Sequence, residues 1–430
     1  MATEPPLAFL QSRVLLVLLA IALLVLQTVA PAQALSLEEA SVHDLQLAFR
    51  QNKLTSRRLT EFYLDRIRRL NPLLRGVIEV NPDALRQADR ADRERKAKPY
   101  GSLSALHGIP ILLKDNIATK DKMNTTAGSF ALLGSVVPRD AGVVARLRRA
   151  GAVLLGKASL SEWAHYRSSG APSGWCARSG QGKEIDPYDA NATTEASKYI
   201  PRGGYKQFLK PDGLKGKRLG IVRHLYVDIY SGTLVAKAFD SHVNTLRKQG
   251  AVVVDHLELV NIDYIYSNAS GEDVATSAEF KLALNTYLQD LEVSPVRSLA
   301  DVIAFNNKHK HVEKMDEYGQ DLFLAAQATN GIDKAVKSAW QNMNRLSRDG
   351  FEKLMRQNKL DALVTPGFLV SRVLAIGGFP GISVPAGYDE NGVPFGICFG
   401  GLRGSEPTLI EIAYAFEQAT KIRRPPSFKR

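Results

Sequence analysis

Short apolar segments alternate with amphipathic segments along much of this 430-residue chain, and this alternation limits the possible folds more than any other feature. Short apolar runs between turn residues predict buried strands, whereas apolar residues recurring every three or four positions predict helices. Strands joined through helices lie parallel in a sheet that helices cover on both faces. The expected strands are residues 77–80, 111–113, 152–155, 217–222, 251–254, 362–365, 382–384 and 395–399.

The helices expected between these strands complete an α/β pattern. Ser36-Leu37-Glu38-Glu39 has the form of a capping box, which predicts that the first helix begins there. Asn71-Pro72 predicts the end of the second helix. The expected helices are residues 36–50, 56–70, 83–98, 142–150, 234–249 and 406–419, with mostly helical sequence over about 273–359. We therefore expect one α/β domain over residues 35–430.

Residues 1–34 read as a secretory signal peptide. Arg13 precedes an uncharged apolar run from Val14 to Leu26, and Ala32-Gln33-Ala34 matches a small-x-small cleavage site. The alternative is an uncleaved signal anchor, which shares this pattern. The prediction is a protein of the secretory pathway, located outside the cell or in the cell wall, with membrane contact only through an uncleaved signal segment.

The charge and the cysteine content exclude several classes of protein. The formal net charge is +12, but no basic and aromatic pattern typical of nucleic-acid binding occurs, which leaves acidic extracellular polymers as a weaker possibility. Two cysteines, Cys176 and Cys398, are too few for a disulfide scaffold, and we expect two unpaired thiols. Asn-x-Ser/Thr sequons, the acceptors of N-linked glycans, occur at Asn124, Asn191 and Asn268.

No motif in the sequence predicts a metal or a cofactor. His309 and His311 are two positions apart, so on a helix they face different ways. Gly203-Gly204 lacks the Lys-Ser/Thr of a phosphate-binding loop and predicts a turn.

Lys114 ends an apolar run, Ile109-Pro110-Ile111-Leu112-Leu113, and is the first candidate for a chemical role. A buried amine favours its neutral form, which is a general base. The alternative is a lysine whose stem covers apolar surface while its ammonium reaches water.

Several blocks around and after Lys114 resemble the amidase signature family, and most closely its secreted plant-type amidases. They include Thr125-Thr126-Ala127-Gly128-Ser129, the run from Gly151 to Lys157, and Ser161-Glu162-Trp163-Ala164. Near the C-terminus the resemblance continues through Asp361 to Pro366 and Pro380 to Gly387. The family also includes proteins like the A subunit of glutamyl-tRNA amidotransferase.

The resemblance implies hydrolysis of carbon–nitrogen bonds in small amides by a Lys–Ser–Ser triad without a cofactor. Lys114 matches the triad lysine. The family places its cis-bonded serine in a Gly-Ser-Ser-Gly-type stretch and its nucleophile in a Gly-Gly-Ser-Ile-type stretch, and both are expected after Lys183. Neither stretch occurs in this chain, which runs from Lys183 directly into Glu184. The prediction is an internal deletion at this junction, dividing the domain into residues 35–183 and 184–430.

Other serines near the junction could in principle replace the missing ones. Ser168, Ser169, Ser173 and Ser179 are candidates, but a serine needs a base and oxyanion donors in place, and loop roles beside glycines explain these residues more simply. Gly128, Ser129, Ser168 and Ser169 are the expected substrate-binding residues.

Two interpretations remain open. The first is an amidase-family hydrolase that is catalytically impaired because both triad serines are missing. The second is a non-catalytic secreted binding protein, or a non-productive product of skipped coding sequence or a faulty gene model. Loss of central strands exposes strand edges and core surface, so we also expect lower stability than in an uninterrupted relative.

Overall fold

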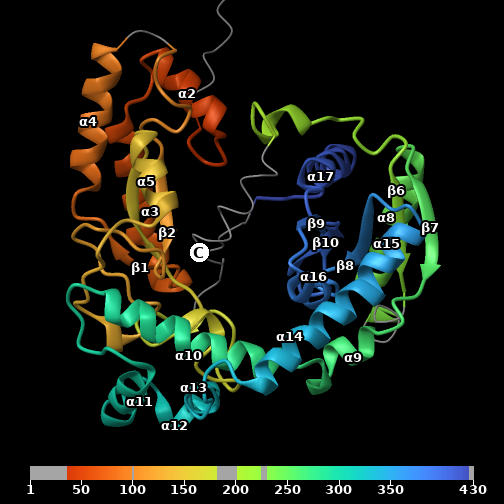
Figure 1. The fold of residues 1–430 in the computed structure, drawn as a ribbon. Helices are drawn as coiled ribbons and strands as arrows, with labels where there is room; N and C mark the ends of the chain where they lie inside the picture. The colour runs from red at the N-terminus through yellow and green to blue at the C-terminus, as the bar shows by residue number, and fades with distance from the viewer. Residues whose placement is uncertain (1–35, 99–100, 182–200, 224–229, 426–430) are drawn as a thin grey trace, which may run out of the picture.

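The structure is a computed structural model, and it describes residues 36–98, 101–181, 201–223 and 230–425 (Figure 1). The expected signal peptide, the Asn191 sequon and the Lys183–Glu184 junction lie outside these residues. In the part of the chain that is described, no helix is long and apolar enough to span a bilayer.

The N-terminal part of the chain forms a three-stranded sheet with helices on both faces. Its strand order is β1-β3-β2, with β1 antiparallel to β3 and β2 parallel to β3. Helices α3 and α4 pack on Val153 and Leu155 of β3, whereas Val144 of α5 packs on Leu154 from the other face. The elements are α2 Val42–Arg50, α3 Ser56–Leu74, β1 Val77–Val80, α4 Ala84–Ala97, β2 Pro110–Lys114, α5 Gly142–Arg149 and β3 Val153–Ala158.

The C-terminal part contains a five-stranded mixed sheet in the order β7-β6-β8-β10-β9. Strands β7, β6 and β8 are parallel, and β10 runs antiparallel to both β8 and β9. The expected βαβ unit is confirmed as β6, α8 and β7. The elements are β6 Arg218–Val222, α8 Leu234–Lys248, β7 Val252–Leu257, β8 Ala362–Pro366, β9 Gly381–Tyr388, β10 Pro394–Gly400 and α17 Glu406–Thr420.

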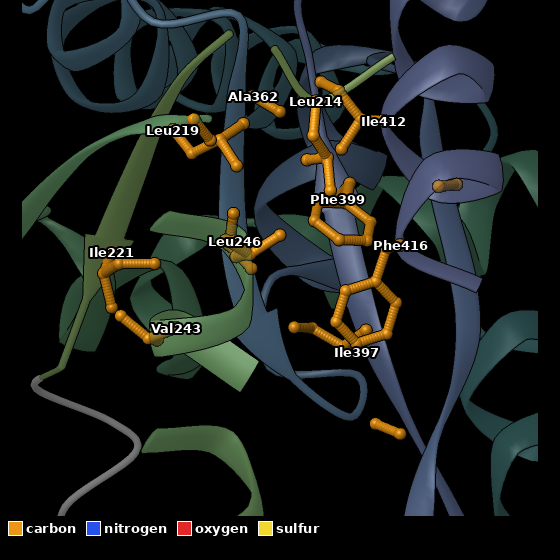
Figure 2. Close-up of a cluster of buried hydrophobic side chains, with 14 of the residues drawn as sticks. Leu214, Leu219, Ile221, Val243, Leu246, Ala362, Ile397, Phe399, Ile412 and Phe416 are labelled. Atoms are coloured by element: carbon orange, nitrogen blue, oxygen red, sulfur yellow. The ribbon is translucent and has the colours of Figure 1, made fainter. Parts of the chain in front are cut away.

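The main core lies between this sheet and helices α8 and α17. Figure 2 shows Phe399 of β10 beside Phe416 of α17, with their ring centroids 5.9 Å apart. Leu219, Ile221 and Leu246 are buried in the same cluster. Because burial of a side chain of this size stabilises a fold by about 1.5–3 kcal/mol, this cluster accounts for much of the stability of the C-terminal part.

Helices between the two sheets form the predicted helical region, and Pro295 lies in the break between α10 and α11 as expected. Leu284 and Leu288 of α10 share a buried cluster with Ala131 and Trp163 of the N-terminal part. The remaining elements are β4 Trp175–Cys176, β5 Gly180–Gln181, α9 Ile262–Tyr266, α10 Glu272–Asp290, α11 Leu299–Lys308, α12 Met315–Tyr318, α13 Asp321–Gln327, α14 Lys334–Ser347, α15 Lys353–Gln357 and α16 Ser371–Gly377.

Two predicted helix boundaries are wrong. The first helix begins at Val42 instead of Ser36, because the capping box forms between Ser41 and Asp44 while Glu39 adopts a left-handed φ of 58°. The second helix continues through Pro72 to Leu74, since a proline near a helix end removes only one hydrogen bond.

The expected α/β fold is confirmed, but the sheets are mixed instead of parallel and the strands are divided between separate sheets. Figure 1 shows the three-stranded and the five-stranded sheet on opposite sides of the molecule, with α10 and α14 running between them. Within the described residues, β2 pairs only with β3, and β9 pairs only with β10. β2 and β9 are therefore edge strands, as are β1 and β7 at the opposite ends of the same sheets, and each has one row of backbone groups that lacks a ladder partner in the described residues.

Candidate functional site

Lys114 lies at the end of β2, where it pairs with Ala158 of β3. Only 8% of Lys114 is exposed, and the following residue, Asp115, is fully buried. The predicted burial of Lys114 is therefore confirmed, and the alternative that its ammonium reaches water stays untested. The catalytic role of Lys114 stays a prediction.

Asp115 holds the 125–129 loop against the end of β2. Its Oδ2 accepts hydrogen bonds from the Thr126 hydroxyl and from the backbone N–H of Gly128 at 3.0 Å. Burial raises the pKa of the Asp115 carboxyl, and the nearby Lys157 charge opposes this effect. The loop that the sequence predicts for substrate binding is thus tied directly to the residue after Lys114.

Lys157 is a second buried lysine in this region, and it was missed as a functional candidate. Its Nζ donates to the Ile117 carbonyl oxygen at 2.7 Å and to Thr125 Oγ1 at 2.9 Å. Burial lowers the pKa of Lys157 to about 8, and attraction to Asp115 limits the decrease. The signal was present in the sequence, since Lys157, like Lys114, comes at the end of an apolar run in its strand.

The predicted substrate-binding residues Gly128 and Ser129 lie in tightly packed surroundings. Gly128 has φ of +79°, and a Cβ there would lie 2.5 Å from the Cβ of Cys176. The buried Ser129 hydroxyl donates to Glu313 Oε1 at 3.0 Å and accepts from the N–H of Ala131. Because a hydroxyl has one proton to donate, Ser129 serves here to connect the loop to the helical region.

A buried ionic cluster, Glu162–Arg167–Glu313, lies next to this loop. All three side chains are at most 2% exposed, and Arg167 NH1 contacts Glu162 Oε2 and lies 3.1 Å from Glu313 Oε2. Burial, followed by repulsion from Glu313, raises the pKa of Glu162 well above its ordinary value. One guanidinium thus compensates two carboxyls, an arrangement that favours a protonated Glu162.

Further contacts position Arg167. Its Nε donates to the Gly319 carbonyl oxygen at 3.1 Å, and its guanidinium lies 4.9 Å from the ring of Trp175. The chain between Glu162 and Arg167 contains three consecutive residues with left-handed backbone, Trp163, Ala164 and His165. Such residues cost about 1–2 kcal/mol each, so the buried cluster must stabilise this turn.

The serines proposed as substitutes have structural partners. The Ser168 hydroxyl donates to the Tyr318 carbonyl oxygen, and the Ser169 hydroxyl donates to Asp321 Oδ2 at 2.6 Å. Ser179 Oγ lies 3.0 Å from Cys176 Sγ, and Ser173 is exposed. Ser168 and Ser169 therefore connect their loop to α12 and α13. Their structural role is distinct from that of the Gly128–Ser129 loop.

Cys176 and Cys398 are both free and buried, as expected. No three His, Cys, Asp or Glu side chains among the described residues converge as a metal site requires. Asn124 of the first sequon donates its side-chain amide to Glu79, whereas Asn268 is exposed.

Comparisons with known proteins agree with the resemblance. Residues 58–176 match the family model described as Amidase. A protein of Arabidopsis thaliana named "Probable amidase" is 48% identical over 484 aligned positions, which cover 91% of this chain and 92% of that protein. The native peptide amidase from Stenotrophomonas maltophilia has a TM-score of 0.80 at 34% identity, and the match covers 91% of this chain and 99% of that one.

The match extends to more distant proteins. The A subunit of the glutamyl-tRNA(Gln) amidotransferase of Thermoanaerobacter pseudethanolicus is 24% identical over 495 aligned positions, covering 91% of this chain and 99% of that protein.

Proposed function

The chain belongs to the amidase family, and from this premise we propose that it is a member whose hydrolytic centre is incomplete. In this proposal Lys114 is the triad lysine, and the segment that carries both triad serines is missing at the Lys183–Glu184 junction. The family's reaction is hydrolysis of the carbon–nitrogen bond of small amides. This chain retains the base and lacks the hydroxyl groups that the base would activate.

The observation that carries the proposal is the missing serine motifs. No Gly-Ser-Ser-Gly and no Gly-Gly-Ser occurs in the 430 residues. The alignment lengths support a deletion. Since 91% of 430 residues is about 391, about 93 of the 484 positions aligned with the Arabidopsis protein contain no residue of this chain.

The arrangement of strands is consistent with the same proposal. A deletion of central strands would leave an edge on each side of the gap. In the described residues the edge strands of these two sheets are β1 and β2 in one and β7 and β9 in the other. Lys114 ends one of these edge strands. In the proposal, the missing segment would lie where it could present its serines to the end of β2.

The partners of three candidate serines also favour an inactive centre. The Ser129 hydroxyl donates its single proton to Glu313. The hydroxyls of Ser168 and Ser169 donate theirs to the Tyr318 carbonyl oxygen and to the Asp321 carboxylate. A serine becomes a nucleophile only when its proton is directed at a base and donors face the developing oxyanion. Loss of triad members costs several powers of ten in turnover, so we expect hydrolysis at the background rate.

We further propose that the protein enters the secretory pathway. The pattern of residues 1–34 supports this location, and the exposed Asn268 is a suitable glycan acceptor there. Treatment of the secreted protein with an endoglycosidase should reduce its mass, and substitution Asn268→Gln should remove that shift if Asn268 carries the glycan.

A restoration experiment tests the proposal directly. The residues that the Arabidopsis relative has at this position are inserted between Lys183 and Glu184, and turnover of a peptide carboxamide is measured. The inserted chain should hydrolyse the amide, whereas the native chain and an inserted chain with Lys114→Ala should stay at background. Hydrolysis by the native chain that Lys114→Ala abolishes would refute the proposal.

A further inference from the structure

A strongly basic cleft lies in the N-terminal part of the molecule, apart from the Lys114 region. It has a volume of about 940 Å³ and is bordered by α2, the start of α3, the second half of α4 and the 101–107 loop. Of the described residues that line it, seven are Arg or Lys and two are Asp. Its size is in the range of ligand sites, which are commonly about 300–1,000 Å³.

Both acidic residues of the cleft are already paired. Asp92 accepts from the N–H of Ser56 at 2.8 Å and from Arg95 NH1 at 2.6 Å. Asp89 accepts from Arg57 NH1 at 2.7 Å. The described lining thus has five more positive than negative side chains, and its two carboxylates already accept from Arg57 and Arg95.

Part of the cleft wall is rigidly held. The Arg95 guanidinium lies 4.1 Å from the ring of Phe49 and donates to Ser56 Oγ at 2.7 Å. His107 is only 4% exposed, and its Nε2 lies 3.0 Å from Glu94 Oε2. The buried Nδ1 of His107 has no hydrogen-bond partner. Apart from that atom, Arg95 and His107 are held by protein partners and form a fixed part of the wall.

The charge of the whole chain is concentrated in the same region. Residues 36–181 contain 24 Lys and Arg against 14 Asp and Glu, a net charge of +10 out of the total of +12. A concave surface with one sign of charge raises the local concentration of opposite charges. The cleft is therefore the place where an anionic partner would be attracted most strongly.

We propose that this cleft binds an acidic polysaccharide through its carboxylates. Arg93 and Lys96, three positions apart on α4, and Lys98 just beyond it are exposed cations that can meet successive carboxylates of a sugar chain. Nucleic acid fits less well, because single strands bind through exposed aromatic rings that stack on bases. Among the described lining residues, Phe49 is the one Phe, Tyr or Trp, and Arg95 covers its ring.

The test measures binding of an oligomer of galacturonic acid to the full chain by calorimetry at low and at physiological salt. The cleft variant carries Arg93→Glu, Lys96→Glu and Lys98→Glu. These residues are exposed, so the variant should fold, which a thermal melt verifies. Affinity should fall at least about tenfold, and the remaining binding should depend less on salt.

A matched control variant distinguishes the effect of the cleft residues on affinity from the effect of net charge alone. Lys308→Glu, Lys334→Glu and Lys337→Glu change the charge by the same amount at exposed positions on α11 and α14. This control should bind within about twofold of the native chain. Equal weakening in both variants, no binding by the native chain, or tighter binding of a single-stranded DNA of the same charge would each overturn the proposal.

Discussion

Substitution Arg167→Met should destabilise the protein by more than a typical point mutation, because it removes the one cation between two buried carboxyls. Arg167 NH1 lies 3.1 Å from Glu313 Oε2 and contacts Glu162. At that distance and an effective dielectric constant of about 20, one attraction is worth about 5 kcal/mol. Dehydration of the three groups offsets much of this energy, so the expected loss is about 3–5 kcal/mol.

The loss of stability caused by Arg167→Met should increase with pH. Between its ordinary pKa of 4.5 and its raised value, the Glu162 carboxyl holds a proton in the folded chain and releases it on unfolding. The free energy of unfolding therefore falls as pH rises through this interval. Without Arg167 the folded-state pKa of the Glu162 carboxyl rises further, so the difference in free energy of unfolding between native chain and variant should be larger at about pH 8 than at about pH 5.

Urea denaturation followed by circular dichroism measures these differences at both pH values. The triple variant Arg167→Met, Glu162→Gln, Glu313→Gln should recover about half of the loss or more, since no buried charge remains. Arg348→Met is the matched control, because the side chain of Arg348 is 66% exposed, and it should change stability by less than about 0.5 kcal/mol. A loss for Arg167→Met below about 1 kcal/mol, or one independent of pH, would refute the reasoning.

Three further predictions concern the loop beside Lys114. Burial lowers the pKa of Lys157 in the folded chain to about 8, against an ordinary value of 10.5, so between pH 8 and 10.5 the folded chain binds fewer protons than the unfolded chain. In urea denaturation, the free energy of unfolding of the native chain should therefore rise with pH relative to that of Lys157→Met. A difference between the two chains that does not change with pH would count against this prediction. Gly128→Ala should lower the free energy of unfolding by about 2–4 kcal/mol, through left-handed backbone strain and overlap with Cys176. The control Gly134→Ala, which has the same backbone strain but open space around it, should lower it by about 1 kcal/mol. Equal urea midpoints for the two variants would show that the overlap is absent. Lys114→Ala should leave peptide carboxamide turnover at the background of the native chain, and a measurable decrease would mean that the lysine still works in catalysis.

Local patterns predicted most of the fold. The βαβ unit from β6 to β7 and the strand at Val77–Val80 follow from apolar periodicity that tertiary packing reinforces. The first helix boundary failed because Ser36 and Ser41 both begin capping-box patterns. The helix begins at the second one, where Ser41 and Asp44 form the capping box, because the left-handed φ of 58° at Glu39 interrupts a helix from Ser36.

The candidate site was predicted in part. Burial of Lys114 followed from its apolar strand, and the same signal applied to Lys157. The pairing of Arg167 with Glu313 spans 146 positions and depends on how the helical region folds back, which no local pattern contains. The roles of Ser168 and Ser169 depend on the same long-range contacts, since their partners lie 150 and 152 positions away.

Reaction of the purified native chain with a fluorophosphonate tests the central claim most directly. The reagent phosphonylates a serine oxygen only where a base and oxyanion donors activate it, and intact-mass spectrometry detects the adduct. A known serine hydrolase treated in parallel verifies the reagent. The account predicts no adduct on this chain, and a stoichiometric adduct on any serine, lost in Lys114→Ala, would contradict it.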